Sequence, residues 1–380
     1  MKTRSQLLLP LLLFPFVLFA QQTKAPVFTA GTEGYASYRI PALIRLPDGQ
    51  LLAFAEGRLH NAADFGDIDI VLKRSKDNGR SWQPLEKVVD NDSLQAGNPA
   101  PVVDLTDPDY PGGRIFLFYN TGNNHEGEVR KGKGLREVWY ITSSDGGQHW
   151  SAPVNITAQV HRPHQPEDWR SYANTPGHAL QFSRGQYRGR LYVAANHSQG
   201  NPQPHFKDYC SHGYYTDDHG KTFHLAQSLP VPGSNECMAA ELANGALMLN
   251  ARNQQGNVKA RIVAISKDGG ATWDQYSYDP QLPDPVNQGS LLNIAWKKGQ
   301  PVLACCNAAD TLQRNHLTLR ISEPGGRHWR RSYEIEASND KKGDYAAYSD
   351  IANISRQQIG ILYERKGYKE IVFTVVNWTK

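Results

Sequence analysis

The stretch Ser75-Lys76-Asp77-Asn78-Gly79-Arg80-Ser81-Trp82 decides the fold, because the chain repeats its pattern along its length. The pattern is Ser or Thr, any residue, Asp, any residue, Gly, two further residues and an aromatic residue. The other copies are Ser143 to Trp150, Thr216 to Phe223, Ser266 to Trp273 and a degenerate one, Ser322 to Trp329. Successive copies are offset by 68, 73, 50 and 56 residues. Repeats at this spacing are typical of solenoids, propellers and arrays.

Each copy has the composition of a tight turn between two strands. The Asp side chain can accept hydrogen bonds from backbone N–H groups two residues on, and Gly supplies the positive φ that a tight turn needs. We expect the aromatic residue to pack back onto a sheet face. Strand-like residues precede three copies, at 68–72, 138–141 and 262–265. Each copy is therefore predicted to be a hairpin turn in a small antiparallel sheet, and to serve the scaffold rather than catalysis.

The rest of the chain also has the pattern of strands and contains no long amphipathic helix. A hairpin is predicted from residues 41–46 and 51–56 around the turn Pro47-Asp48-Gly49. Further strands are predicted at 114–120, 191–196, 247–252, 301–306, 358–363 and 371–376. Five turns, with a sixth sheet closed by strands from both ends, predict an all-β fold, a six-bladed β-propeller. No Ser- or Pro-rich linker divides the chain, so residues 21–380 are expected to form one domain.

The first residues have the features of a secretory signal. Lys2 and Arg4 precede an almost wholly apolar run, 7–19, and Ala20 offers a small residue before polar ones. We interpret residues 1–20 as a signal peptide; an uncut hydrophobic anchor is the alternative. The mature protein is then expected to be secreted or periplasmic, with no membrane span after signal cleavage.

Composition gives little support for a nucleic-acid-binding or a metal-binding protein. The net charge of +4 is small and makes no case for nucleic acid as a partner. The four cysteines, Cys210, Cys237, Cys305 and Cys306, have no zinc-ligand spacing, and sequence alone does not pair them. We therefore predict no metal and no cofactor.

Three arginines stand at the ends of predicted strands in different repeats: Arg39, Arg252 and Arg314. In a propeller, such strand ends converge on one rim around the central axis. Guanidinium groups gathered without an anion would repel one another. They are favourable if the ligand carries a carboxylate, which Arg binds in bidentate geometry.

The element Tyr38-Arg39-Ile40-Pro41, followed by the repeated Asp turns, resembles the bacterial-type exo-α-sialidases (neuraminidases) of glycoside hydrolase family 33. The resemblance runs over residues 35–376. It implies a six-bladed propeller that removes terminal sialic acid from glycans. Arg39, Arg252 and Arg314 match the arginine triad that binds the sialic acid carboxylate. Glu364 matches the glutamate that holds the first arginine.

The resemblance also implies catalytic residues. Within the predicted loop 56–67, Asp64 matches the acid/base aspartate, with Asp67 as the alternative. Tyr348 matches the nucleophile, with Tyr345 as the alternative, and Glu236 matches the glutamate that takes its proton.

Further contacts with substrate are expected around these residues. Arg58 matches a further binding arginine. Asn98 matches a motif at a strand start facing the site, and Trp169 and His197 are candidates for contact with the acyl group or the next sugar.

The implied reaction is hydrolysis with retention of configuration, carried out by a monomer on sialylated glycans. A carboxylate nucleophile would approach the like charge of the sugar's own carboxylate, whereas a neutral phenol would not. Because the phenol pKa is near 10, a tyrosine nucleophile needs a base within hydrogen-bond range. Two alternatives stay open: a trans-sialidase, which keeps every catalytic residue, and a catalytically inactive sialic-acid-binding lectin.

Overall fold

The structure is a computed structural model that describes residues 24–339 and 344–379. The predicted signal peptide, residues 1–20, lies outside the described residues. The described chain is almost entirely β-strand. Its helical segments are α1 (Glu126–Val129), α2 (Thr157–Val160), η1 (Gly185–Tyr187), η2 (Pro204–Phe206) and η3 (Ala243–Gly245). Among these residues, no helix is long and apolar enough to cross a membrane.

The strands of the described chain form hydrogen-bonded sheets that follow one another in sequence. An eight-stranded sheet contains β2 (Ser37–Arg45), β3 (Leu51–Arg58), β4 (Ile68–Ser75), β5 (Glu86–Val89), β6 (Gln95–Asp104), β7 (Arg114–Gly122), β8 (Arg136–Ser143) and β9 (Val154–Asn155). The next contains β10 (Trp169–Asn174), β11 (Leu180–Gln181), β12 (Leu191–Gln199), β13 (Tyr209–Thr216) and β14 (His224–Leu225). Two four-stranded sheets follow, β15 (Ser234–Glu241), β16 (Leu247–Asn253), β17 (Ala260–Ser266) and β18 (Gln275–Pro283), then β19 (Gly289–Lys297), β20 (Gln300–Ala308), β21 (Leu317–Ser322) and β22 (Trp329–Glu336).

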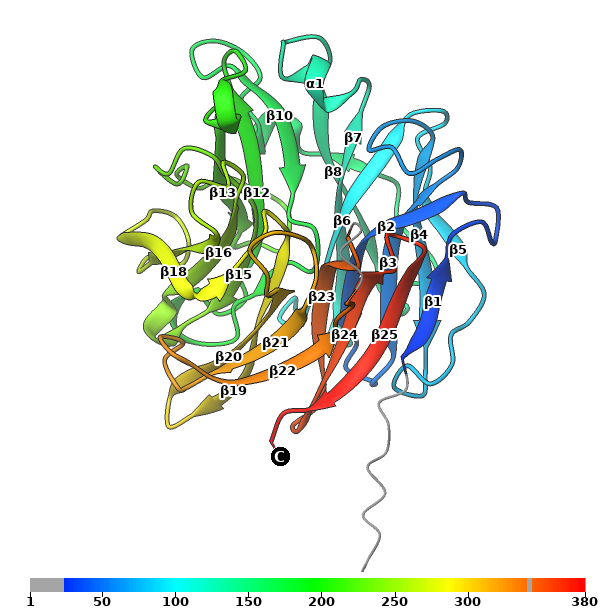
Figure 1. Cartoon of the computed structure of the whole chain (residues 1–380), viewed down its shortest axis with the longest axis vertical. Coiled ribbons are helices and arrows are strands. Elements are labelled where there is room, and N and C mark those ends of the chain that lie inside the picture. Colours follow the sequence, from blue (N-terminus) through cyan, green and yellow to red (C-terminus); the bar gives the residue numbers. More distant parts are fainter. Residues whose placement is uncertain (1–23, 340–343, 380) are drawn as a thin grey trace, which may run out of the picture.

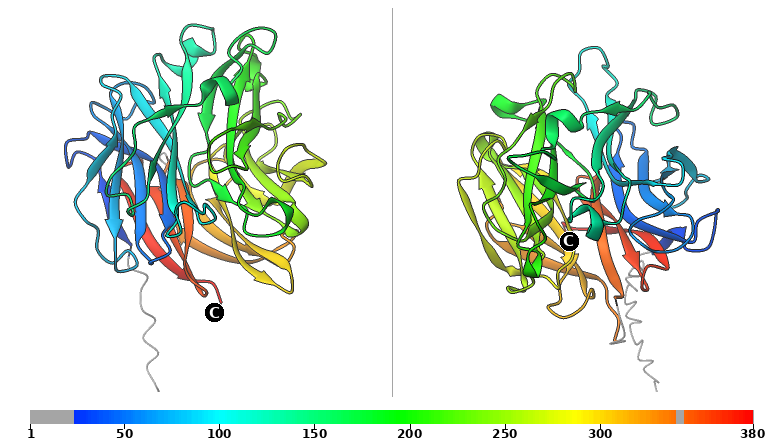
Figure 2. Two further views of the ribbon diagram at one scale, coloured as in Figure 1. Left: turned by 180° about the vertical axis from the view of Figure 1, so that it is seen from behind. Right: turned by 90° about the horizontal axis from the view of Figure 1, so that it is seen from above.

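The last sheet joins the two ends of the described chain. It contains β23 (Ala346–Ser355), β24 (Gln358–Arg365), β25 (Glu370–Asn377) and, at its outer edge, β1 (Ala25–Thr29). β1 pairs antiparallel with β25, which places the blue and red strands side by side in Figure 1. The sheets stand around a common centre in a propeller-like arrangement, which the view from above in Figure 2 shows. Strands from both ends of the described chain therefore pair, as predicted. The N-terminal partner is β1, which the sequence analysis did not identify as a strand.

Apolar side chains fill the junctions between neighbouring sheets. Phe116 and Phe118 of β7, for example, belong to one buried cluster with Tyr214 of β13. Leu249 of β16 packs in a cluster with Tyr192 of β12. The strands are buried on both faces because each sheet has a neighbour on either side, and this burial stabilises the ring.

The repeated turns have a shared hydrogen-bond pattern. In the first, the Gly79 N–H donates to Ser75 Oγ at 2.8 Å, and Ser75 Oγ donates to Asp77 Oδ1 at 2.8 Å. Asp77 Oδ1 also accepts from the Ser81 N–H at 2.9 Å, so the Asp closes the turn four residues on rather than the expected two. The degenerate turn at 322–329 has Pro324 in place of Asp, and there the Glu323 N–H donates to the His328 carbonyl at 2.8 Å.

The glycine of the repeated turn packs against a neighbouring sheet, as two copies show. A Cβ at Gly79 would lie 2.0 Å from Phe373 Cε1 of β25, and one at Gly220 would lie 2.7 Å from Phe116 Cε1 of β7. Gly79 has φ +82°, a conformation that glycine adopts without strain. These turns therefore seal the junctions between sheets.

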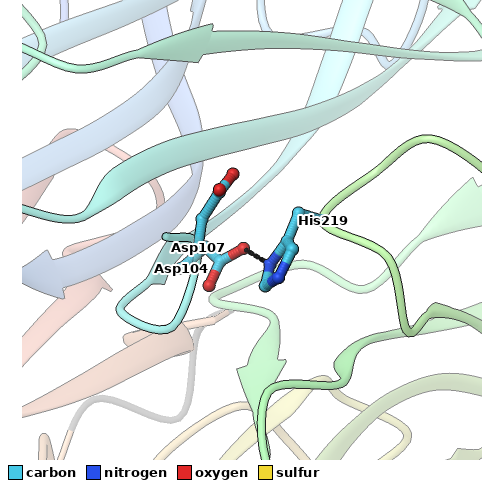
Figure 3. A group of neighbouring side chains, drawn as sticks. All are labelled: Asp104, Asp107 and His219. Carbon is cyan, nitrogen blue, oxygen red and sulfur yellow. Dashed lines mark hydrogen bonds and ion pairs between the residues drawn. The ribbon is translucent and has the colours of Figure 1, made fainter. Parts of the chain in front are cut away.

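The third turn is also tied to its neighbour by polar groups (Figure 3). His219 Nδ1 lies 2.7 Å from Asp104 Oδ2 at the end of β6. Arg114 Nη2 lies 2.7 Å from Asp107 Oδ2 and donates to the His219 carbonyl at 2.7 Å. Asp104, Asp107 and His219 thus all have hydrogen-bond or ion-pair partners within the protein, and these contacts join two neighbouring sheets.

Replacing Gly79 with Ala is expected to destabilise the protein more than the same change at Gly31. Both glycines have φ near +80°, but nothing lies within 4 Å of a Cβ at Gly31. The extra cost at Gly79, about 1–3 kcal/mol, measures the overlap with Phe373. Urea denaturation of G79A and G31A tests this, and equal loss in both variants would contradict the sealing role of the turn.

Candidate active site

The candidate site lies near the centre, where strands of different sheets meet. β2 contacts β6 and β23, and β19 contacts β15 and β23. On most of these strands the register shifts near the centre: on β2 between Arg39 and Ala42, on β6 between Gly97 and Ala100, on β15 between Ser234 and Cys237, and on β23 between Ala346 and Ser349. Such bulges re-aim side chains. Every one of these bulges includes or adjoins a residue that the sequence analysis assigns to the site.

Arg39 is held by the buried carboxylate of Glu364 on β24. Arg39 Nε donates to Glu364 Oε1 at 2.8 Å, and Nη2 donates to Oε2 at 3.3 Å. The Ile40 N–H donates to Oε1 at 2.9 Å. Ile40 has φ +57°, an uncommon and strained conformation for a β-branched residue. Its N–H makes the bond to Glu364 in this conformation. Burial would lower the pKa of Arg39, but Glu364 raises it above its ordinary value, so the guanidinium stays charged.

Arg252 and Arg314 approach Tyr348 from two further sheets. Arg252 Nη1, at the end of β16, donates to the Tyr348 hydroxyl at 2.9 Å. The Arg314 guanidinium carbon lies 5.4 Å from the centroid of the Tyr348 ring, and the Arg39 carbon lies 5.3 Å from it. Tyr368 links two of the arginines, since its ring lies 4.1 Å from the Arg39 carbon and its hydroxyl accepts from Arg314 Nη1 at 2.8 Å. The three predicted arginines therefore surround one tyrosine ring.

The Tyr348 hydroxyl forms a close pair with Glu236. It lies 2.7 Å from Glu236 Oε1 and 2.9 Å from Oε2. Arg252 Nη1 also donates to Glu236 Oε2 at 2.7 Å. Burial and the negative charge of Glu236 raise the pKa of Tyr348 well above its ordinary value, although the three arginines oppose the shift. The phenol is therefore neutral and has a proton acceptor in contact.

Asp64 lies at the mouth of the site, in the loop between β3 and β4. Its side chain is 76% exposed, and its Oδ1 accepts from Arg58 Nη1 at 2.7 Å and lies 3.8 Å from Arg39 Nη1. Desolvation alone would raise the pKa of Asp64. The positive charges of Arg58 and Arg39 have the larger effect, so the pKa lies below its ordinary value. The neighbouring guanidinium groups therefore outweigh desolvation and keep the carboxyl ionised.

Glu56 holds Arg58 from behind. Arg58 Nη2 donates to Glu56 Oε2 at 2.7 Å, and the Asn98 N–H donates to Glu56 Oε1 at 2.9 Å. Glu56 and Arg58 belong to β3, which runs to Arg58, so the predicted loop 56–67 begins three residues too early. A carboxylate two residues before an arginine in a buried strand was the available signal for this pair, and the sequence analysis did not use it.

A buried polar network supports the backbone after Tyr348. The Ser349 N–H donates to Gln288 Oε1 at 3.0 Å, and Gln288 Nε2 donates to the Ser349 carbonyl at 3.0 Å. Asp350 accepts from the Leu43 N–H at 2.8 Å and pairs with His178 at 2.7 Å. The sequence analysis missed Gln288, His178 and Asp350, because they come from segments far apart in the chain and lack any shared motif.

The predicted site residues gather in one place. A cavity of about 210 Å³ is lined by Arg39, Arg58, Asp64, Asn98, Glu236, Arg252, Arg314 and Tyr348, together with Gln95, Glu126, Arg136, Tyr172 and others. Glu364 lies behind Arg39 and is fully buried. The alternative aspartate, Asp67, lines a different, outer pocket with Asp69. The alternative tyrosine, Tyr345, packs against an apolar cluster between the last two sheets.

Two of the expected contacts lie elsewhere. Trp169 and His197 stack on each other, with ring centroids 3.5 Å apart, inside a buried cluster and not on the cavity wall. His197 is also joined to His212 at 3.0 Å between their Nδ1 atoms. The expectation that these rings contact substrate is therefore not supported; the cavity side of this region is formed by Ser171 and Tyr172.

Comparisons with known proteins agree with this fold. Residues 49–361 match the family model described as the BNR repeat-like domain. This span covers most of the chain, so the protein is a BNR-repeat protein.

Individual relatives show which kind of BNR-repeat protein this is. The chain is 31% identical over 370 residues to the exo-alpha-sialidase of Arthroderma benhamiae, covering 91% of this chain and 82% of the relative. It is 30% identical over 361 residues to the sialidase of Micromonospora viridifaciens; there it covers 90% of this chain but only 52% of the relative. The solved Hadza microbial sialidase Hz136 superposes with a TM-score of 0.77 at 26% identity, over 94% of this chain and 68% of that one. The chain belongs to the sialidase family.

Replacing Glu364 with Gln is expected to cost about 3–5 kcal/mol of stability, because it removes the partner of a buried arginine charge. The matched control is Glu334→Gln. Glu334 is 57% exposed and pairs with His316 at 2.8 Å, so its loss is expected to cost less than about 1 kcal/mol. Denaturant melts of both variants measure the difference; similar small losses would show that the Arg39–Glu364 pair is not a structural anchor.

Proposed function

We propose that this chain is an exo-α-sialidase that hydrolyses terminal sialic acid from glycans with retention, using Tyr348 as the nucleophile. The observation that carries the proposal is the Tyr348–Glu236 pair at 2.7 Å, enclosed by three arginines in one cavity. The names of the relatives support the same activity.

The arginines bind and orient the sugar through its carboxylate. Arg39, Arg252 and Arg314 present guanidinium groups from three sheets to one cavity, and Arg is suited to bidentate carboxylate binding. Carboxylates already hold each of them from the protein side: Glu364, Glu236 and Asp344. These partners fix the geometry before substrate arrives, and such preorganisation favours catalysis.

Asp64 is the proposed acid for the leaving glycosidic oxygen. Arg58 and Arg39 lower the pKa of Asp64, so it is ionised at neutral pH. A bound carboxylate neutralises part of the positive potential of Arg39, and this raises the pKa of Asp64 toward the range of a useful acid. Substrate binding therefore prepares the acid that the reaction needs.

In the first step the bond between the anomeric carbon and the leaving oxygen breaks, and a bond from Tyr348 Oη to that carbon forms. The Tyr348 proton passes to Glu236, and the Asp64 proton passes to the leaving oxygen. In the second step Asp64 takes a proton from water, water attacks the anomeric carbon, and Tyr348 leaves and recovers its proton from Glu236. Two inversions give net retention. Sialidases with a tyrosine nucleophile are a known exception among glycosidases.

We also propose the finer fold assignment, a six-bladed propeller with Asp-box turns. It is supported by the eight-stranded sheet, whose antiparallel groups β2–β5 and β6–β9 are joined only by the pair Ile68–Gln95. Of the seven hydrophobic clusters in the described residues, six lie one at each junction between neighbouring strand groups, which agrees with six blades; the seventh, Ile40, Ala347 and Tyr348, is small. Residues 21–380 are proposed to be the mature catalytic domain, a monomer that acts outside the cytoplasm after removal of residues 1–20.

Replacing Tyr348 with Phe is expected to lower kcat/KM for sialyl-methylumbelliferone at least about a thousandfold, because the attacking oxygen is lost. Tyr345→Phe is the matched control. It removes a neighbouring hydroxyl outside the cavity and should leave activity within about threefold. Fluorescence assays on both variants measure this, and normal turnover by Y348F would reject the assigned nucleophile.

The pH dependence of the wild type is expected to reveal the shift at Asp64. Asp64 acts as an acid only when protonated, so activity falls as pH rises through its pKa. On a sialyl-lactose substrate, kcat/KM reports the free enzyme, where the pKa is lowered, and kcat reports the complex, where it is raised. We expect kcat to fall at a higher pH than kcat/KM. Coincident profiles would contradict this; Asp67→Asn should change neither.

A further inference from the structure

The loop that carries Asp64 is bonded to a side chain of the cavity wall. Residues 59–67 join β3 to β4, and 59–64 are all exposed. Arg58 Nη1, at the end of β3, donates to the Ala62 carbonyl at 2.6 Å and to Asp64 Oδ1 at 2.7 Å. Arg58 is buried and lines the cavity, so these bonds reach the loop from its inner side.

Phe65, the residue after Asp64, gives the loop a contact with the neighbouring strand group. Its ring centroid lies 4.8 Å from that of His125, with the ring planes tilted by 56°. Aromatic rings attract each other at this separation. His125 lies in the loop between β7 and β8, directly before α1. Phe65 is half-buried, and its ring therefore joins a loop of the group β2–β5 to a loop of the group β6–β9.

The loop that carries His125 is itself anchored. The His125 carbonyl accepts from the Val129 N–H at 2.9 Å. Arg130, directly after α1, donates to both carboxylate oxygens of Asp208, at 3.0 and 2.8 Å, and the Asp208 side chain is fully buried. The ring of His125 therefore belongs to a segment that is tied to the next sheet, and Phe65 packs against a fixed partner.

The backbone after Phe65 adds little rigidity to the loop. Gly66 has φ +146°, a conformation that other residues rarely adopt, and nothing lies within 4 Å of a Cβ at this position. The chain can therefore turn at Gly66, and loss of the Phe65 ring would let Asp64 move. A displacement of about 1 Å at a reacting group can cost roughly a hundredfold in rate.

We propose that Phe65, stacked on His125, is a positioning residue that holds Asp64 where it can give its proton to the leaving glycosidic oxygen. This inference rests on the proposed function, because it takes Asp64 as the acid. Neither Phe65 nor His125 lines the cavity, so both act on the reaction through the loop.

The test compares kcat/KM for two substrates that differ in their need for an acid. Sialyl-lactose releases a sugar alcohol, which leaves poorly unless it is protonated, whereas sialyl-methylumbelliferone releases a phenol, which leaves readily as an anion. kcat/KM covers the steps up to release of this group, in which Asp64 acts as the acid. In F65A we expect about a tenfold loss on sialyl-lactose and a loss within about twofold on the phenol substrate. F65Y keeps the ring and should behave as the wild type.

Variants of His125 provide a second arm. H125A should reproduce the selective loss, and F65A/H125A should be no worse than either single variant, because all three remove the same contact. H125F keeps a ring and should retain the wild-type selectivity. The control Y276A removes an aromatic side chain that is 49% exposed on β18, outside the cavity, and should change neither kcat/KM value.

D64A separates this inference from the proposed function. It should lose far more activity on sialyl-lactose than on the phenol substrate. If D64A shows this selectivity but F65A loses activity equally on both substrates, or on neither, the positioning role is overturned and the proposed function stands. Additive losses in F65A/H125A would also overturn it. Equal losses of D64A on both substrates would instead reject Asp64 as the acid, and with it both the proposed mechanism and this inference.

Discussion

The buried carboxylate of Glu364 is the interaction on which the site depends. It accepts bonds from Arg39 at 2.8 Å and from the Ile40 N–H at 2.9 Å, and it lies 3.4 Å from the Tyr348 nitrogen. One side chain therefore sets the position of the first arginine and of the tyrosine. Arg39 and Glu364 are 325 residues apart in sequence, so they meet only when the ring of sheets has closed. The geometry of the site is thus a consequence of the closure of the fold.

The charges of the cavity are arranged largely in pairs of arginine and carboxylate. Glu364, Glu236 and Glu56 each hold one arginine from the protein side. These carboxylates fix guanidinium groups that would otherwise repel one another, yet Arg136 and part of the triad still face the cavity. The same positive field lowers the pKa of Asp64 until a ligand reduces it. Binding and proton transfer are therefore coupled through one set of charges.

The sequence predicted the scaffold well and the site only in part. The turn pattern and apolar alternation located the strands, because both depend on local chemistry. The positions of the three arginines at strand ends indicated an anion site, and the family motifs gave Asp64, Glu236 and Tyr348. Period-two reasoning does not give the directions of Arg39, Glu236 and Tyr348, because bulges on β2, β15 and β23 break the alternation near them. Gln288, which holds the backbone of Ser349, could not be found from sequence, since its partner lies 61 residues away in another sheet.

The pairing of β1 with β25 has a consequence for biogenesis. The strand that completes the last sheet is made first, and its partner is made near the end of synthesis. Until β25 has been made, β1 has no strand to pair with, and unpaired strand edges recruit other chains into aggregates. Folding must therefore be largely post-translational at this seam. A nascent chain held in an extended state until release would avoid that exposure.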